Sequence, residues 1–225
     1  MIWAIFQFEN DRFLSAQNLT NLMLQITATG LISVGIVYVL LLGEIDLSVG
    51  SVSGLAAAIL AVGFVQLQWN LVLALIAAIA AGALVGLLYG FLYTRFGLPS
   101  FVITLAGLLG FLGLQLWILG DTGSIGLPFD SWIVEFAQQW YLPAWASYIA
   151  AGLAAAAYAW ILLRRARQRA AANLVSQSYL EIGVRSGALV AFLLVAAWYL
   201  NLSRGVGVMF LFFLVLVVIV NFALT

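Results

Sequence analysis

GEIDLSVGSV, residues 43–52, places the two carboxylates Glu44 and Asp46 between two long uncharged stretches. These stretches are residues 22–42 and residues 48–65. Each is long enough to cross the hydrocarbon core of a bilayer as a helix, which takes roughly 20 apolar residues for about 30 Å. We therefore interpret the acidic segment as the junction between two transmembrane helices.

The composition is that of an integral membrane protein. Hydrophobic residues make up 66% of the 225-residue chain and charged residues only 7%. A soluble globule of this size could not bury so much apolar surface. The apolar stretches are continuous rather than alternating, which favours helices over a β-barrel, because a helix satisfies its own backbone hydrogen bonds in lipid.

The predicted fold class is all-α, a polytopic transmembrane helix bundle with about seven complete helices. These helices are expected at residues 22–42, 47–65, 71–94, 99–119, 143–163, 186–201 and 206–222. Residues 1–8 are expected to form only part of a further helix, because eight residues reach about 12 Å. Residues 1–225 are thus predicted to form a single transmembrane domain.

Two of these helices carry a face of small residues. Its members are Gly50, Ser51, Ser53, Gly54, Ala57 and Ala61 in one helix, and Gly82, Gly86 and Gly90 in the next. Small residues let helix backbones approach closely in a membrane, where lipid offers no hydrophobic contrast. Tight helix packing is expected at both faces.

The distribution of arginine predicts the orientation. Five of the eight basic residues, all of them arginine, lie in residues 164–185, which are therefore expected to form a cytoplasmic basic connector. Residues 120–142 contain three acidic residues together with tryptophan and tyrosine, and they are predicted to form a periplasmic loop with a short interfacial helix. Successive helices cross the membrane in opposite directions, so this orientation puts residues 43–52 on the cytoplasmic side, unless they re-enter the membrane.

Several classes of function are excluded by what the sequence lacks. It contains no cysteine and no histidine, and its formal charge is zero. Disulfides, zinc sites, histidine bases and thiol nucleophiles are therefore ruled out, and the charge balance argues against a nucleic-acid partner. We predict that the chain is not an enzyme and binds no metal and no cofactor of its own.

Glu44, Asp46, Ser48 and Gly50 form the polar motif at the junction. Asp46 or Ser48 suits the N-cap of the following helix, so a structural role explains Asp46 simply. Glu44 has no such explanation and needs hydrogen-bond donors if it is buried. An energy-coupling contact and a proton relay are the functional alternatives for this motif.

A second group of candidates consists of polar residues inside apolar helices. Its members are Gln25, Thr29, Ser33, Thr104 and Gln115. They are candidates for a substrate pathway, because uncharged ligands are bound by hydrogen-bonding groups rather than by fixed charges. Hydrogen bonds between packed helices are the alternative use of such side chains.

Three ordered motifs carry a resemblance to a known family. They are Phe13-Leu14-Ser15 with Asn18-Leu19, the junction at residues 43–52, and LPSFVITLAG at residues 98–107. Together they resemble the membrane permeases of bacterial ABC importers for monosaccharides, such as the ribose and xylose permeases. Glu44 within the motif and the long basic connector are most similar to the xylose-type branch.

The resemblance implies a multi-pass permease of the bacterial inner membrane that forms the pathway for a monosaccharide, with a xylose-like pentose as the expected cargo. It also implies a homodimer embedded in membrane lipid, a periplasmic sugar-binding protein and cytoplasmic ATPase subunits that bind ATP. Members of this family begin with a complete first helix and continue beyond the span that corresponds to residues 206–222. The chain is therefore expected to be truncated at both ends or to be a shortened homologue.

Two other functions remain open at this point. A degenerate permease homologue could serve as a structural or accessory subunit of another membrane complex. An ion-coupled secondary transporter could instead use Glu44 and Asp46.

Overall fold

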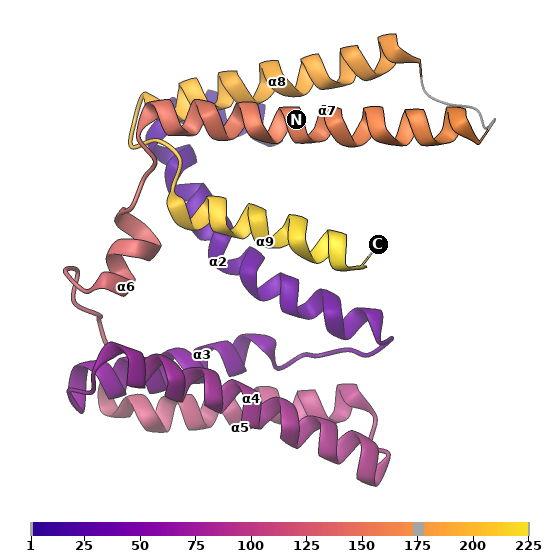
Figure 1. Cartoon of the computed structure of the whole chain (residues 1–225). Coiled ribbons are helices and arrows are strands. Elements are labelled where there is room, and N and C mark those ends of the chain that lie inside the picture. Colours follow the sequence, from indigo (N-terminus) through magenta and orange to yellow (C-terminus); the bar gives the residue numbers. More distant parts are fainter. Residues whose placement is uncertain (1, 173–177, 225) are drawn as a thin grey trace. The chain divides into compact units, whose positions relative to one another are not determined.

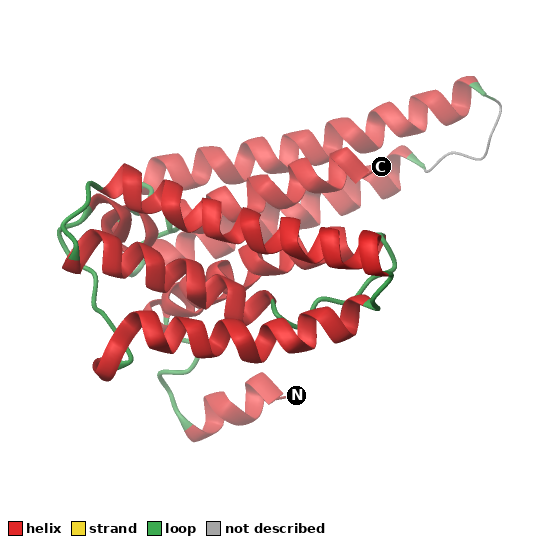
Figure 2. Cartoon of the chain, turned by 90° about the horizontal axis from the view of Figure 1, so that it is seen from below, coloured by secondary structure: helices red, strands yellow, loops and turns green. Residues whose placement is uncertain are grey.

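The computed structural model describes residues 2–172 and 178–224, and its regular structure there is helical (Figure 2). Six described helical segments are long and apolar enough to cross a membrane. They are α2 (Ala16–Leu41), α3 continued by the π-helix η1 (Val49–Gln66), α4 (Leu71–Phe96), α5 with η2 (Ser100–Thr122), α7 (Ala144–Ala171) and α8 (Tyr179–Asn201). The shorter apolar helix α9 spans Val208–Leu224, and α1 spans Ile2–Glu9. The all-helical prediction is confirmed.

The chain divides into two compact units, which are described separately. One unit contains residues 1–27 and 135–218, and the other contains residues 28–134 and 219–225. The second unit holds the acidic junction together with α3, α4 and α5. The first unit holds the pair α7 and α8.

In the second unit, α3 packs against both α4 and α5 (Figure 1). Of the expected small-residue face of α3, Ser51 and Ala61 are buried, whereas Gly50 and Ala57 are exposed. The backbone of Gly54 lies so close to the Gln115 side chain that a Cβ atom at Gly54 would meet the Gln115 amide. Tight packing is therefore confirmed for part of this face only.

The ends of α4 and the start of α5 follow from local sequence. Asn70 caps α4 by accepting a hydrogen bond from the Leu73 backbone N–H at 2.7 Å. Gly97 ends α4 in the left-handed conformation, with φ of 64°, which glycine adopts without a steric penalty. Pro99 is the N-cap of α5, so the helix begins at Ser100, one position later than the sequence suggested.

The glycine repeat of α4 does not pack against another described helix, and the packing prediction for it was wrong. A Cβ atom added at Gly82, Gly86 or Gly90 would meet nothing within 4 Å. The physical reason lies in the tyrosines on the same face of α4, which are described with the site below.

In the first unit, α7 and α8 pack against each other as an antiparallel pair. Asn201 at the end of α8 donates a hydrogen bond to the Ser147 hydroxyl near the start of α7, at 2.8 Å. The Tyr199 hydroxyl on α8 donates to the backbone carbonyl of Leu14 at 2.8 Å. These bonds fix the end of the pair that lies away from the arginine-rich segment.

Both helices extend further than the sequence indicated. α7 continues to Ala171 rather than ending at residue 163, and α8 begins at Tyr179 rather than at Ser186. Arginine, alanine and glutamine are good helix formers, and residues 164–171 contain no glycine or proline that would end the helix. The predicted connector at residues 164–185 is thus largely helical where it is described, and residues 173–177 lie outside the described part.

The segment at residues 120–142 contains the short helical piece that was expected. It consists of the 3-10 turn η2 (Gly120–Thr122), α6 (Trp132–Val134) and the π-helix η3 (Glu135–Gln139). Its placement on the periplasmic side stays a prediction.

Candidate functional site

The junction between α2 and α3 is fastened to α4 at two points. The Tyr93 hydroxyl donates a hydrogen bond to Glu44 Oε1 at 2.7 Å, and the Tyr89 hydroxyl donates to Ser48 Oγ at 2.7 Å. The two tyrosines are four residues apart, so they lie on one face of α4, one turn from each other. Their partners are also four positions apart. The junction segment therefore runs along α4.

Asp46 organises the turn that leads into α3. Its Oδ1 atom accepts hydrogen bonds from both the backbone N–H and the hydroxyl of Ser48, each at 2.7 Å. Ser48 occupies the N-cap position of α3, as expected, but its side chain makes no capping bond; its hydroxyl donates to Asp46 and accepts from Tyr89. Ser48 is completely buried. The result is a directed chain of hydrogen bonds from Tyr89 through Ser48 to the Asp46 carboxylate.

α5 contacts the junction from its own side. Ser100 Oγ accepts a hydrogen bond from the Ile45 N–H, and Thr104 Oγ1 donates to the Ile45 carbonyl, both at 3.3 Å. Ser100 and Thr104 are four residues apart and so face the same way on α5. They satisfy both backbone polar groups of Ile45, which removes the cost of leaving these groups without partners. The junction is thereby held between two helices.

A cavity of about 450 Å³ lies at this place and is called the junction pocket here. Its lining residues are Val39, Leu42, Glu44, Ile45, Asp46, Gly86, Tyr89, Gly90, Tyr93, Ser100, Ile103 and Thr104. Cavities that bind small molecules typically start at about 300 Å³. The junction pocket is therefore large enough for a small ligand.

Glycine shapes the junction pocket. Gly86, Tyr89, Gly90 and Tyr93 follow the spacing of a single helix face, so the glycines leave open space between the two tyrosine rings. On α5, a Cβ atom at Gly107 would collide with the Tyr89 hydroxyl, so the glycine there lets this ring reach Ser48. Two glycines of the α4 repeat, Gly86 and Gly90, thus line the pocket, whereas Gly82 does not.

The electrostatics of the pocket are set by Glu44. A hydrogen bond from the Ser100 side chain, and then the one from Tyr93, lowers the pKa of the Glu44 carboxyl below its ordinary value. The donors favour the ionised form because they bind the carboxylate directly. Glu44 therefore carries a negative charge at neutral pH.

Acidification is expected to remove the stabilisation that Glu44 supplies. Because its pKa is lowered on folding, this contribution is fully present above the ordinary value of 4.5 and is lost as the pH falls through the lowered value. The measurement is the unfolding temperature of the wild-type protein and of Glu44→Gln between pH 7 and pH 3. The difference between them is expected to shrink below pH 4.5. A difference that stays constant over this range would contradict the assignment.

The structure brings together only some of the residues that the sequence singled out. Glu44, Asp46 and Thr104 line the junction pocket, and Ser48 is hydrogen-bonded to two of its lining residues, Asp46 and Tyr89. Gly50 lies in the first turn of α3, where a Cβ atom would meet nothing within 4 Å. Gly50 is thus not required by packing within the described chain.

The other pathway candidates lie elsewhere. Gln115 packs against Gly54 where α3 meets α5 and does not line the junction pocket. Gln25, Thr29 and Ser33 are exposed on α2, and the Ser33 hydroxyl donates to the Thr29 carbonyl at 2.8 Å. None of these three is among the residues that line the junction pocket.

Sequence reasoning missed three residues of the site, namely Tyr89, Tyr93 and Ser100. The available signal was the four-residue spacing. Tyr89 with Tyr93 on one helix, and Ser100 with Thr104 on the next, each place two hydroxyl groups on one helix face. Hydroxyl pairs of this kind inside apolar helices require polar partners.

Known proteins resemble this chain over most of its length. Residues 18–168 match the family described as branched-chain amino acid transport system / permease component. The chain is 34% identical over 206 residues to the xylose transport system permease protein XylH of Escherichia coli K12, covering 91% of this chain and 52% of that protein. No solved structure matches.

Two further relatives are named for other sugars. The ribose import permease protein RbsC of Bacillus subtilis is 38% identical over 133 residues, which cover 59% of this chain and 41% of the relative. The L-arabinose ABC transporter permease protein AraH of Azospirillum brasilense is 36% identical over 109 residues, which cover 47% of this chain and 31% of the relative. The chain spans about half the length, or less, of the curated relatives it matches.

Proposed function

This chain belongs to the branched-chain amino acid transport system / permease component family, and we propose that it is the membrane-spanning permease subunit of an ATP-driven monosaccharide importer. The family membership confirms the resemblance seen in the three sequence motifs, and with it the prediction of a multi-pass membrane transport protein. The proposed cargo is a pentose of the xylose type. The relatives named above are designated for xylose, ribose and L-arabinose, which are all five-carbon sugars.

The observation that carries the proposal is the chemistry of the junction pocket. A pentose is neutral and presents several hydroxyl groups together with apolar C–H faces. The carboxylates of Glu44 and Asp46 can accept hydrogen bonds from such hydroxyls, and the rings of Tyr89 and Tyr93 can pack against the C–H faces. The cavity of about 450 Å³ leaves room for a molecule of this size.

The proposed architecture has seven membrane spans within one permease domain, residues 1–225. The six long apolar segments supply six spans, and α9 supplies the seventh, because its 17 residues meet the lower limit for crossing a bilayer. α1 then contributes part of a further span. The arginine-rich end of α7 lies in the cytoplasm, and residues 120–142 lie in the periplasm.

The remaining components of the proposed importer are other polypeptide chains. Two copies of the permease enclose the sugar pathway, a periplasmic binding protein delivers the sugar, and cytoplasmic ATPase subunits bind and hydrolyse ATP. Gln115 is proposed to contact the pathway from the α3–α5 interface, where its amide lies against Gly54. Thr104 is proposed to line the same pathway through the junction pocket.

Uptake by the full assembly tests this function. The protein is co-expressed with a candidate ATPase and a candidate sugar-binding protein from the same genome, and uptake of labelled xylose, ribose and L-arabinose is measured in membrane vesicles with and without ATP. ATP-dependent uptake of at least one pentose is expected. Gln115→Leu is expected to reduce uptake severalfold while leaving the amount of assembled protein unchanged.

Other results would assign a different function. Uptake that follows a proton gradient without ATP would indicate a secondary transporter. Stable association with an unrelated membrane complex, without uptake and without an ATPase, would indicate an accessory subunit. Equal loss of assembled protein and uptake in Gln115→Leu would remove Gln115 from the pathway.

A further inference from the structure

The last turns of α7 carry four arginines within six residues, and all four side chains are exposed. They are Arg164, Arg165, Arg167 and Arg169, and they are called the arginine collar here. Ala166 lies between them in the chain but is buried, and α8 is the helix that packs along α7. At 3.6 residues per turn, the four arginines spread over about 200° of the helix surface away from Ala166. The positive charge therefore surrounds most of this helix end.

The collar begins where the helix leaves the hydrocarbon core. Residues 144–163 are uncharged, and 20 helical residues span about 30 Å, which is the thickness of the core. Trp145 and Trp160 are both strongly exposed near the two ends of this stretch, as is typical of side chains at the membrane interfaces. Arg164 therefore emerges at the depth of the lipid phosphates.

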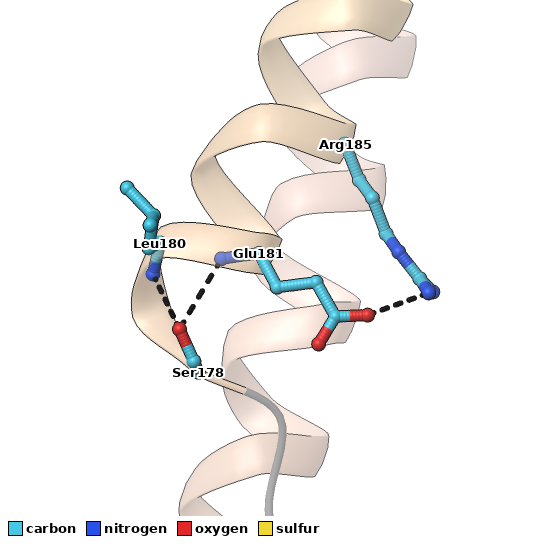
Figure 3. A network of polar contacts seen from close by, with 4 residues as sticks. All are labelled: Ser178, Leu180, Glu181 and Arg185. Carbon is cyan, nitrogen blue, oxygen red and sulfur yellow. Dashed lines mark hydrogen bonds and ion pairs between the residues drawn. The ribbon is translucent and has the colours of Figure 1, made fainter.

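The charge of the collar is not neutralised within the described part of the chain. None of its four guanidinium groups forms an ion pair with a described residue. Arg185 on α8 provides the contrast, because it pairs with Glu181 at 2.6 Å next to the helix start that Ser178 caps (Figure 3). Four uncompensated charges thus lie together on α7, while the nearby basic residue of α8 is already paired.

We propose that the arginine collar binds the headgroups of anionic phospholipids. A guanidinium group can donate two parallel hydrogen bonds to phosphate oxygens, and clusters of four or more basic residues just outside a membrane span attract anionic lipid. The arrangement around the helix favours lipid over an acidic protein. Lipids reach a membrane helix from all sides in the plane of the bilayer, whereas a docked protein would contact one side.

Lipid selectivity of the purified full-length protein tests this inference. The protein is placed in vesicles of phosphatidylcholine with increasing phosphatidylglycerol, and association of each lipid is measured by quenching of tryptophan fluorescence with brominated lipid. The fourfold variant R164Q/R165Q/R167Q/R169Q is expected to lose the preference for phosphatidylglycerol by at least about tenfold, since each arginine near an anionic surface contributes about fivefold. The variant R164K/R165K/R167K/R169K is expected to keep most of the preference for phosphatidylglycerol.

Two half variants and one control complete the test. R164Q/R167Q and R165Q/R169Q, which remove charge from different sides of α7, are each expected to lower the preference by similar factors. E181Q/R185Q, which removes an already neutral pair, is expected to leave it unchanged. If the fourfold variant fails to insert into the membrane, the two half variants still test the inference.

The inference would be overturned by either of two results. One is unchanged lipid selectivity in both half variants. The other is an effect confined to one half variant, accompanied by binding of an acidic protein partner. Sugar uptake is measured separately, so a failure of the proposed function would not be mistaken for a failure of lipid binding.

Discussion

Asp46→Ala is expected to lower the free energy of unfolding by about 2–6 kcal/mol, because two donors of the buried Ser48 lose their acceptor at a cost of roughly 1–3 kcal/mol each. Tyr89 also loses the ordered hydroxyl to which it donates. The turn before α3 then loses both hydrogen bonds between Asp46 and Ser48. Unfolding in a titration with denaturing detergent, followed by tryptophan fluorescence, measures the effect.

Two further variants separate this explanation from a general effect of charge. Asp46→Asn retains a carbonyl oxygen that can accept from Ser48, so its loss of stability is expected to be less than half of that of Asp46→Ala. Asp121→Ala removes an exposed acid of the loop that follows α5 and is expected to be neutral. Wild-type stability of Asp46→Ala would show that the Tyr89–Ser48–Asp46 chain does not hold the junction.

Glu44→Ala is expected to reduce ATP-dependent sugar uptake by about tenfold or more, the scale of one lost hydrogen bond to a charged group. The same variant is expected to insert into the membrane normally, because Glu44 is only partly buried and the apolar helices determine insertion. Uptake per molecule of inserted protein is the quantity to compare.

Variants of the residues that donate hydrogen bonds to Glu44 show whether these bonds contribute to uptake. Tyr93→Phe and Ser100→Ala each remove one donor to the carboxylate and are expected to reduce uptake less than Glu44→Ala does. Glu181→Ala is the control, since that acid lies in the other unit and pairs with Arg185. Normal uptake by Glu44→Ala would exclude a role for the carboxylate in transport. If Glu44→Ala lowers the amount of inserted protein by the same factor as uptake, the role of Glu44 is structural.

Much of the fold followed from local sequence. The lengths of the apolar stretches predicted the membrane helices, and Gly97 with Pro99 marked the break between α4 and α5. The predicted end of α7 is wrong, because the first arginine marks the end of the membrane span but not of the helix, which continues to Ala171. A membrane span ends where charge appears, but a helix ends only where its backbone hydrogen bonds stop.

The site was less predictable than the helices. The acidic motif stood out in the sequence because charged residues between apolar stretches are rare, and Thr104 was also identified in advance. The glycine repeat of α4 misled the packing prediction, because the same spacing is used there to leave space beside two tyrosines. Spacing alone does not distinguish a helix contact from the wall of a cavity.

The sequence by itself determined that this chain is a bundle of membrane helices with an acidic junction, because hydrophobic length and charge are properties of contiguous residues. Only the tertiary structure decided what that junction contacts. Tyr93 lies 49 positions from Glu44, and Thr104 lies 59 positions from Ile45. Hydrogen bonds over such separations depend on how α3, α4 and α5 pack, and no local pattern encodes which helix faces meet.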